Sequence, residues 1–190
     1  MQDERTSFLD DAQALLDQAA EPALERIRRD RKKVPPRLQP LLEHLETHLF
    51  DPALNVSNLK RACGIRDNSI AILFHAEVGH SPKNYISDRR LETAARLLRD
   101  TGLRIWQIGE LIGYSSLGVF SKAFNRWAGQ RPKTYRRQIR RELGASEGPR
   151  PPLAIDDDIL RRALTGKLED QEAERLIRRL MELYPTSRFE

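Results

Sequence analysis

Residues 105–135, with the sequence IWQIGELIGYSSLGVFSKAFNRWAGQRPKTY, predict two short helices joined by a glycine turn. The first segment, 105–112, has apolar residues at the spacing of one helix face. Gly113 follows, where the chain can adopt the left-handed conformation that ends a helix, and Ser116 is a good N-cap for the next one. We predict that second helix over 116–127. Its expected buried residues are Phe120, Phe124 and Trp127.

The same pattern occurs about fifty residues earlier, so the middle of the chain is an internal repeat. The helix predicted over 56–63 corresponds to 105–112, and Gly64 corresponds to Gly113. Four later positions recur as well: Phe74, Gly79, Pro82 and Tyr85 match Phe124, Gly129, Pro132 and Tyr135. A helix, a tight glycine turn and a second helix with a free outer face form a helix-turn-helix, whose second helix enters the major groove of DNA. We therefore predict a first motif at 56–79 and a second motif at 105–129.

A longer amphipathic helix is predicted between the two motifs, over residues 82–99. At about 1.5 Å per residue this helix is roughly 27 Å long. Successive major-groove segments lie about 34 Å apart, so two motifs held by such a rod are slightly too close together for straight DNA. We therefore expect the DNA to bend in the complex.

The flanking segments complete an all-α fold of tandem helix-turn-helix subdomains joined by a long linker helix. Residues 1–35 are expected to form a helical N-terminal arm whose apolar stripe Pro22 interrupts. The DNA-binding part is expected at 36–143, followed by a linker at 144–152 and a small acidic helix pair at 153–190. The two terminal extensions are compatible with homodimerisation, with contact to a partner protein, or with packing back onto the body.

Composition and motifs exclude several other classes of protein. Cys63 is the only cysteine, so an intramolecular disulfide and a multi-cysteine metal site are ruled out. The longest apolar run, 70–74, is far too short to cross a bilayer, and the N-terminus lacks a signal-peptide pattern. No phosphate-binding loop or catalytic triad is recognisable, and the acidic run 156–158 fits helix capping better than metal binding. We expect a cytoplasmic, nucleoid-associated protein that is not an enzyme and needs no cofactor.

The basic charge of the chain is confined to its middle. Residues 38–143 contain 17 Lys and Arg against 10 Asp and Glu, a net charge of +7. Residues 1–37 are neutral overall, and residues 144–190 carry −2. A polyanion is expected to bind where the positive charge gathers, although a solvated charged surface has the same composition.

The repeat region also resembles a known family. The segment NYISDRRLETAARLLRDTGLR at 84–104, followed by IxxIGxLIGYSSxxxFSKAFNRWxGxRPKTYRR at 105–137, is similar to the AraC/XylS family of transcriptional regulators. The resemblance extends over residues 38–141. It implies a seven-helix domain whose two motifs insert into adjacent major grooves and activate or repress promoters.

The second motif has the more complete set of candidate DNA contacts. The resemblance places the positions of Leu117, Gly118, Val119, Ser121 and Lys122 near the bases. Lys122 is the best candidate for a guanine contact, and it is equally compatible with a phosphate contact or a solvated side chain. The predicted contacts are Ser116, Leu117, Gly118, Ser121, Lys122, Arg126, Lys133, Arg136 and Arg137. The last four of these are expected to neutralise phosphates, which sets affinity rather than sequence choice.

The first motif departs from the family in two places. Ile72 corresponds to Lys122, where relatives often have arginine, and Lys60 corresponds to Gly109, where a small residue lets the helices pack closely. The predicted contacts of this motif are Arg66, Asn68, Ser69, Ala71 and Ile72. Asn68 can pair with adenine, and an apolar side chain can touch a thymine methyl. The alternative is that this motif reads little sequence and braces the second.

These observations predict a sequence-specific regulator of transcription that binds double-stranded DNA. RNA polymerase or another regulator is a further candidate partner. The alternative is a helical protein-interaction module with a degenerate first motif, acting through a regulator partner.

Overall fold

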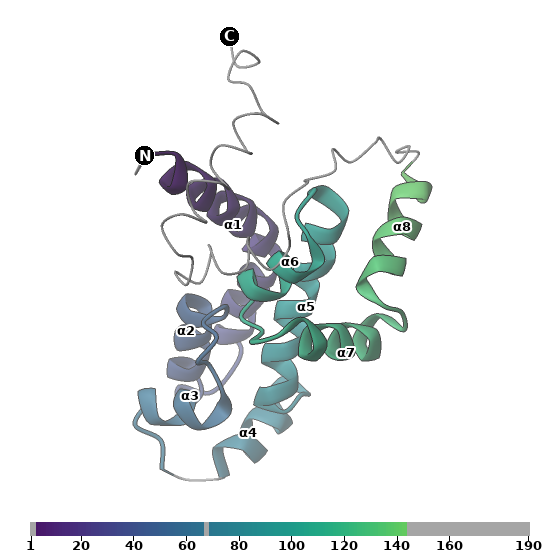
Figure 1. Cartoon of the computed structure of the whole chain (residues 1–190). Helices are drawn as coiled ribbons and strands as arrows, with labels where there is room; N and C mark the ends of the chain where they lie inside the picture. The colour runs from purple at the N-terminus through teal and green to yellow at the C-terminus, as the bar shows by residue number, and fades with distance from the viewer. Residues whose placement is uncertain (1–2, 67–68, 144–190) are drawn as a thin grey trace. The chain divides into compact units, whose positions relative to one another are not determined.

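The computed structural model describes residues 3–66 and 69–143, and this part of the chain contains helices and no strands, which confirms the all-α prediction. Its helices are α1 (Asp3–Arg31), α2 (Gln39–His48), α3 (Val56–Ala62), α4 (Ser69–Val78), α5 (Pro82–Asp100), α6 (Ile105–Leu111), α7 (Leu117–Ala128) and α8 (Pro132–Glu142) (Figure 1). The first motif consists of α3 and α4, and the second of α6 and α7. Asn68, the segment 144–152 and the predicted helix pair at 153–190 lie outside the described residues.

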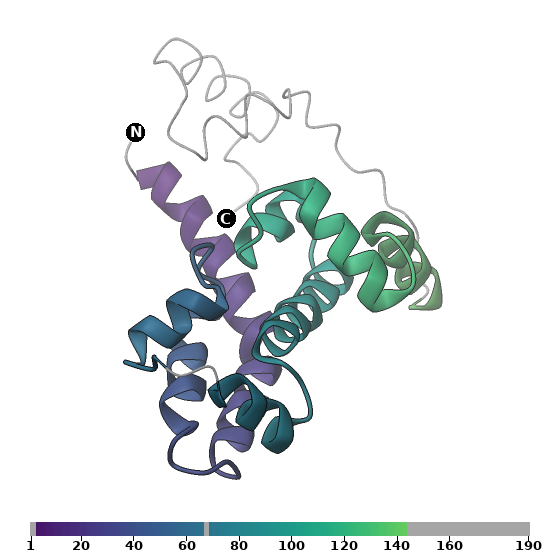
Figure 2. The same ribbon diagram turned by 90° about the horizontal axis from the view of Figure 1, so that it is seen from below.

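The helix α5 is the predicted linker helix, and it lies between the two motifs (Figure 2). Its first turns, with Tyr85 and Ile86, pack into one hydrophobic core together with α2, α3 and α4. Its later turns, with Leu91 and Leu98, pack into a second core together with α6 and α7. Each motif therefore has a core of its own, and α5 contributes different residues to each of the two cores.

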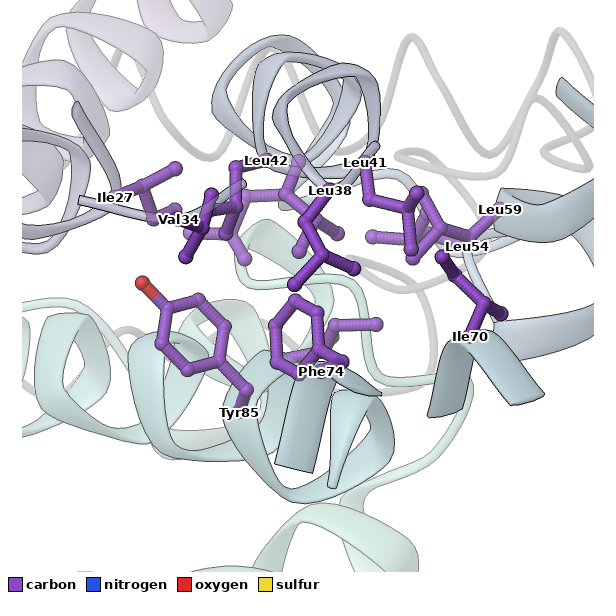
Figure 3. Packing of buried hydrophobic residues seen from close by; sticks show 13 residues of the cluster. Ile27, Val34, Leu38, Leu41, Leu42, Leu54, Leu59, Ile70, Phe74 and Tyr85 are labelled. Carbon is purple, nitrogen blue, oxygen red and sulfur yellow. The ribbon is translucent and has the colours of Figure 1, made fainter. Parts of the chain in front are cut away.

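Figure 3 shows the core of the first half, where Phe74 of α4 and Tyr85 of α5 lie beneath the leucines of α2. The Tyr85 hydroxyl donates a hydrogen bond of 2.7 Å to a carboxylate oxygen of Asp30, near the end of α1. The guanidinium of Arg89 lies 5.1 Å from the centre of the Tyr85 ring and pairs with Glu92 at 2.9 Å. A buried aromatic side chain with a polar tip thus joins α1 to α5.

The sequence repeat is also a repeat of local geometry. Phe74 and Tyr85 meet edge to face, with ring centres 5.5 Å apart and planes at 78°. Phe124 and Tyr135 meet in the same way, at 5.3 Å and 77°. Such pairs add to the hydrophobic effect of burying the rings. In each copy, this pair fastens the second helix of the motif to the helix that follows it.

The N-terminal helix α1 is continuous, whereas Pro22 was expected to interrupt it. The interruption was predicted because proline lacks an N–H and crowds the preceding turn. Tertiary packing outweighs that penalty here, because Ala20 and Ala23 beside the proline are almost fully buried. Leu16 packs into the core of the second motif and Ile27 into the core of the first.

The packing of α1 bears on the roles that were open for the N-terminal extension. The described residues belong to one compact unit, and α1 lies against both α2 and α5 in it. The turn at 32–38 that follows α1 buries Val34 and Leu38 in the first core. Of these three roles, the structure shows the last: α1 packs back onto the body, and its own chain buries its apolar residues from Ala12 to Ile27.

Candidate nucleic-acid interface

The helix α7 has one buried and one open face. Ser116 is its N-cap, as predicted, and its hydroxyl accepts a hydrogen bond from the Val119 N–H at 3.3 Å. Phe120 and Phe124 are fully buried on the inner face. Four residues of the first turns are exposed on the outer face: Leu117, Gly118, Val119 and Lys122. Ser121 is partly buried beside them.

Trp127 was expected in the core, and this prediction was wrong. The side chain is 38% exposed, although its ring still contacts that of Phe124 at 5.7 Å between centres. Tyr135 from α8 packs against Phe124 from another side, at 5.3 Å. Phe124 therefore contacts both rings, and Trp127 lies at the rim of the core.

Four exposed cations on α7 and α8 have no acidic partner among the described residues. They are Lys122 and Arg126 on α7, and Lys133 and Arg137 on α8. Arg28 and Arg31, near the end of α1, differ in this respect. Arg28 pairs with Glu21 and Glu46 at 2.6 Å each, and Arg31 pairs with Glu46 at 3.1 Å. Unpaired cations leave a local positive field that attracts a polyanion.

Arg136 was predicted as a phosphate contact, and the structure places it elsewhere. The residue is only 4% exposed, and one guanidinium nitrogen donates a hydrogen bond of 2.6 Å to the carbonyl oxygen of Leu103. This bond fastens α8 to the turn before α6. The neighbouring Arg137 is exposed on the other side of α8, so only one of these two adjacent arginines faces outward.

The first motif presents a different surface. Its second helix, α4, contains no lysine or arginine, and Ile72, the counterpart of Lys122, is 74% exposed. Ser69 and His75 are also exposed, while Ala71 is partly buried. Arg66, in the turn before α4, is exposed as well. The first motif therefore offers an apolar and uncharged helix face with one cation at its entrance.

The two motifs also differ in how closely their helices approach. A Cβ atom on Gly109 would lie 3.1 Å from a ring carbon of Phe120, so α6 and α7 are in contact where α6 has no side chain. At the corresponding position of α3 stands Lys60, whose side chain is partly buried. The close packing at Gly109 agrees with the role predicted for a small residue there, and the first motif lacks that feature.

Spacing alone did not single out Arg90 and Arg140, which the structure shows to be equivalent. They are fifty residues apart, in register with the Phe, Gly, Pro and Tyr repeat. Arg90 donates a hydrogen bond of 2.7 Å to the carbonyl oxygen of Asp51, and Arg140 one of 3.0 Å to that of Thr101. Each arginine thus binds the chain just after the helix that precedes its own motif. Their identity at matching positions was the signal that could have found them.

Among the described residues, no helix is long and apolar enough to cross a membrane. No group of three or more His, Cys, Asp or Glu side chains gathers there in a way that could hold a metal ion. The lone Cys63 is partly buried against the first core, and its thiol contacts the carbonyl oxygen of Pro40 at 3.4 Å.

Comparison with known proteins supports the arrangement of the repeat. A family model described as a helix-turn-helix domain matches residues 59–138. The transcriptional regulator AlkR from Acinetobacter baylyi is 40% identical over 83 residues, which is 44% of this chain and 27% of AlkR. A putative AraC-like transcription regulator from Streptomyces lividans is 35% identical over 89 residues, 46% of this chain and 29% of that protein. The chain thus spans less than a third of the length of either relative.

A solved structure shows the same fold. It is the C-terminal domain of AraT, a response regulator from Geobacillus stearothermophilus. It aligns with a TM-score of 0.53 and 26% identity, over 56% of this chain and 88% of that domain. Both sequence and fold therefore agree with the resemblance on which the sequence predictions relied. Residues 59–138 match the helix-turn-helix domain family, and the same region is similar to AraC-like transcription regulators.

Proposed function

We propose that this protein is a transcriptional regulator that binds double-stranded DNA sequence-specifically, with α4 and α7 in adjacent major grooves. The observation that carries the proposal is the outer face of α7. It joins exposed apolar and small residues to Lys122 and Arg126, and Lys133 and Arg137 stand on the neighbouring α8; none of the four has an acidic partner among the described residues. A helix of this kind reads base edges while its basic neighbours bind phosphates.

The two motifs have unequal roles in this proposal. In the second, Lys122 and Ser121 read base edges, while Arg126, Lys133 and Arg137 bind phosphates. In the first, Ile72 lies against a thymine methyl, Ser69 and Ala71 lie beside it, and Arg66 binds a phosphate at the groove edge. Because α4 has no cation, the second motif supplies most of the affinity. Bending of the DNA brings the two major grooves into contact with α4 and α7, which α5 connects.

The relatives are transcription regulators, and this defines the cellular setting of the proposal. The protein acts on chromosomal DNA in the cytoplasm, where RNA polymerase or a second regulator is its protein partner. Co-purification with chromosomal DNA and with RNA polymerase from the native cell tests this setting. Recovery in neither fraction contradicts it.

Selection from a pool of random duplexes tests the proposed function. The full chain is incubated with the pool at two salt concentrations, and bound DNA is sequenced. We expect an enriched site with a strong half matching the second motif and a weaker, T-rich half matching the first. Binding must weaken steeply with salt, because phosphate contacts release counterions. Absence of detectable binding at low salt would favour the protein-interaction module instead.

Lys122→Ala tests the reading role of α7. The enriched site is compared with duplexes carrying each substitution at each position. We expect discrimination to relax at one base pair by about 1–3 kcal/mol, while preferences elsewhere persist. Lys133→Ala is the matched control, because it removes another exposed lysine, from α8. It is expected to weaken binding to all duplexes alike. If the two variants gave the same profile, the assignment of Lys122 to base reading would be wrong.

A further inference from the structure

Arg90, in the middle of α5, connects the two halves of the domain. Its side chain donates hydrogen bonds to the carbonyl oxygens of Leu49 at 2.7 Å and Asp51 at 2.7 Å, both in the segment after α2. A third bond of 3.0 Å goes to the carbonyl oxygen of Gly113, in the turn of the second motif. Arg90 is buried and makes no ion pair with a carboxylate in the described part of the chain. Its donors are thus used to bind backbone from both halves.

The surroundings of Gly113 show that this connection is tightly packed. A Cβ atom on Gly113 would lie 2.6 Å from the carbonyl oxygen of Phe50 and 3.0 Å from the guanidinium carbon of Arg90. The next residue, Tyr114, has its ring 6.0 Å from that carbon and its hydroxyl 3.3 Å from the Ser87 hydroxyl on α5. The turn of the second motif is therefore pressed against the first half. By contrast, a Cβ atom on Gly64, in the turn of the first motif, would meet nothing within 4 Å.

These contacts fix an orientation and not only a separation. A straight helix sets how far apart two motifs lie, but each motif could still rotate if only its own core held it. Arg90 binds the segment leading into the first motif and the turn inside the second motif with one planar group, whose donors have a rigid geometry. A rotation of one half against the other would break bonds on one side and leave buried carbonyl groups unpaired, which is costly.

We infer that Arg90 is a positioning residue that fixes the angle between the two motifs and thereby the half-site spacing that the protein accepts on DNA. The inference rests on the proposed function for its DNA readout. One base pair changes the rotation between half-sites by about 34–36°, so a rigid joint must discriminate strongly between spacings. A loose joint must accept several spacings, each with weaker binding, because the second motif no longer arrives pre-oriented.

Arg140 provides a matched control. It stands at the equivalent position of the second repeat and also binds a carbonyl oxygen, that of Thr101. Its bond joins α8 to the end of α5 and does not reach the first motif. The variants Arg90→Met and Arg140→Met remove the same group and keep a long side chain, so they differ in whether the two halves lose a connection.

The first experiment uses the enriched site and a series of duplexes in which one or two base pairs are added or removed between its halves. We expect the wild-type protein to bind one spacing at least about tenfold more tightly than its neighbours. Arg90→Met is expected to lose about tenfold at that spacing and to bind the whole series within about threefold. Arg140→Met keeps the wild-type profile. If Arg90→Met retained the sharp preference for one spacing, the inference would be overturned.

A second measurement does not depend on DNA and serves if Arg90→Met fails to fold. Spin labels are attached to cysteines that replace His75 on α4 and Asn125 on α7, both exposed, in a Cys63→Ser chain. The distribution of distances between the two labels is then compared between the labelled parent chain and its Arg90→Lys variant, which is a milder change than Arg90→Met. We expect a narrow distribution in the parent and a broader one in the lysine variant. Equal widths would refute the inference that Arg90 fixes the angle between the two motifs. Failure of the wild-type chain to bind any duplex would contradict the proposed function and leave this distance test decisive for Arg90.

Discussion

Replacing Gly113 by alanine is expected to lower the free energy of unfolding by about 2–5 kcal/mol, more than any other substitution proposed for this chain. Two costs add together. Gly113 has φ +81°, a left-handed conformation that is unfavourable for alanine. The new methyl group would also lie 2.6 Å from the carbonyl oxygen of Phe50. Urea unfolding followed by circular dichroism measures the change, because Gly113 lies in a compact unit whose described residues are mostly helical.

Gly64→Ala separates these two costs. Gly64 occupies the equivalent turn with φ +67°, but a Cβ atom there would have no neighbour within 4 Å. We expect this variant to lose only about 1–2 kcal/mol, the penalty of the left-handed backbone. The difference between the two variants reports the packing of the second turn against the first half. Equal losses would mean that this packing contributes nothing.

Replacing Arg136 by alanine is expected to lower the free energy of unfolding by about 3 kcal/mol. The variant loses a hydrogen bond from a charged donor, leaves the Leu103 carbonyl without it, and removes a buried aliphatic stem. Under conditions where the variant remains folded, the dependence of DNA affinity on salt should match that of the wild type. Thermal or urea unfolding and binding at several salt concentrations provide the two readouts.

Arg137→Ala is the natural control, since it removes the same side chain one residue later. Arg137 is exposed, so we expect the free energy of unfolding to change by less than about 0.5 kcal/mol. Its DNA affinity should fall for all sequences, with the salt slope reduced by about 1. A reversed pattern, with Arg136 affecting the salt slope and Arg137 affecting stability, would show that α8 is rotated relative to the structure.

The parts of the fold that the sequence predicted well are those in which backbone chemistry and side-chain spacing agree. Gly64 and Gly113 have the predicted left-handed conformation, and Ser116 caps α7 as expected. The linker helix begins at Pro82, as predicted, and ends one residue later than expected, at Asp100. These features depend on neighbours within a few positions along the chain. The repeat strengthened these predictions, because each feature either occurs in both copies or lies next to a feature that does.

The predictions that failed depended on contacts between distant segments. The spacing of α8 gives no indication that Arg136 binds the Leu103 carbonyl, because a charged residue is normally expected at the surface. Trp127 was placed in the core by its spacing from Phe120, but it is 38% exposed, and Tyr135 from another helix also packs against Phe124. Pro22 was interpreted as a helix breaker from its local chemistry, yet Leu16 before it and Ile27 after it are both buried in hydrophobic cores.

The candidate site was predictable to the extent that exposure follows helical period. Leu117, Gly118 and Lys122 are exposed on one face of α7, as the spacing indicated. The roles of these residues in reading bases remain predictions that the proposed selection tests. Arg90 was not predicted as a connector, because its three acceptors are backbone atoms from two other segments, and backbone acceptors have no signature in the sequence.

The placement of α1 has a consequence for synthesis. This helix precedes α2 and α5 in the chain, so the ribosome produces its apolar face before the segments that cover it. An isolated helix is marginally stable, and Leu16 must wait for α6 and α7 before its core can close. Chains emerging at about 5–20 residues per second therefore pass through a period of several seconds in which this face is uncovered. During that period a nascent chain is most vulnerable to aggregation, and a holding chaperone would have its binding site there.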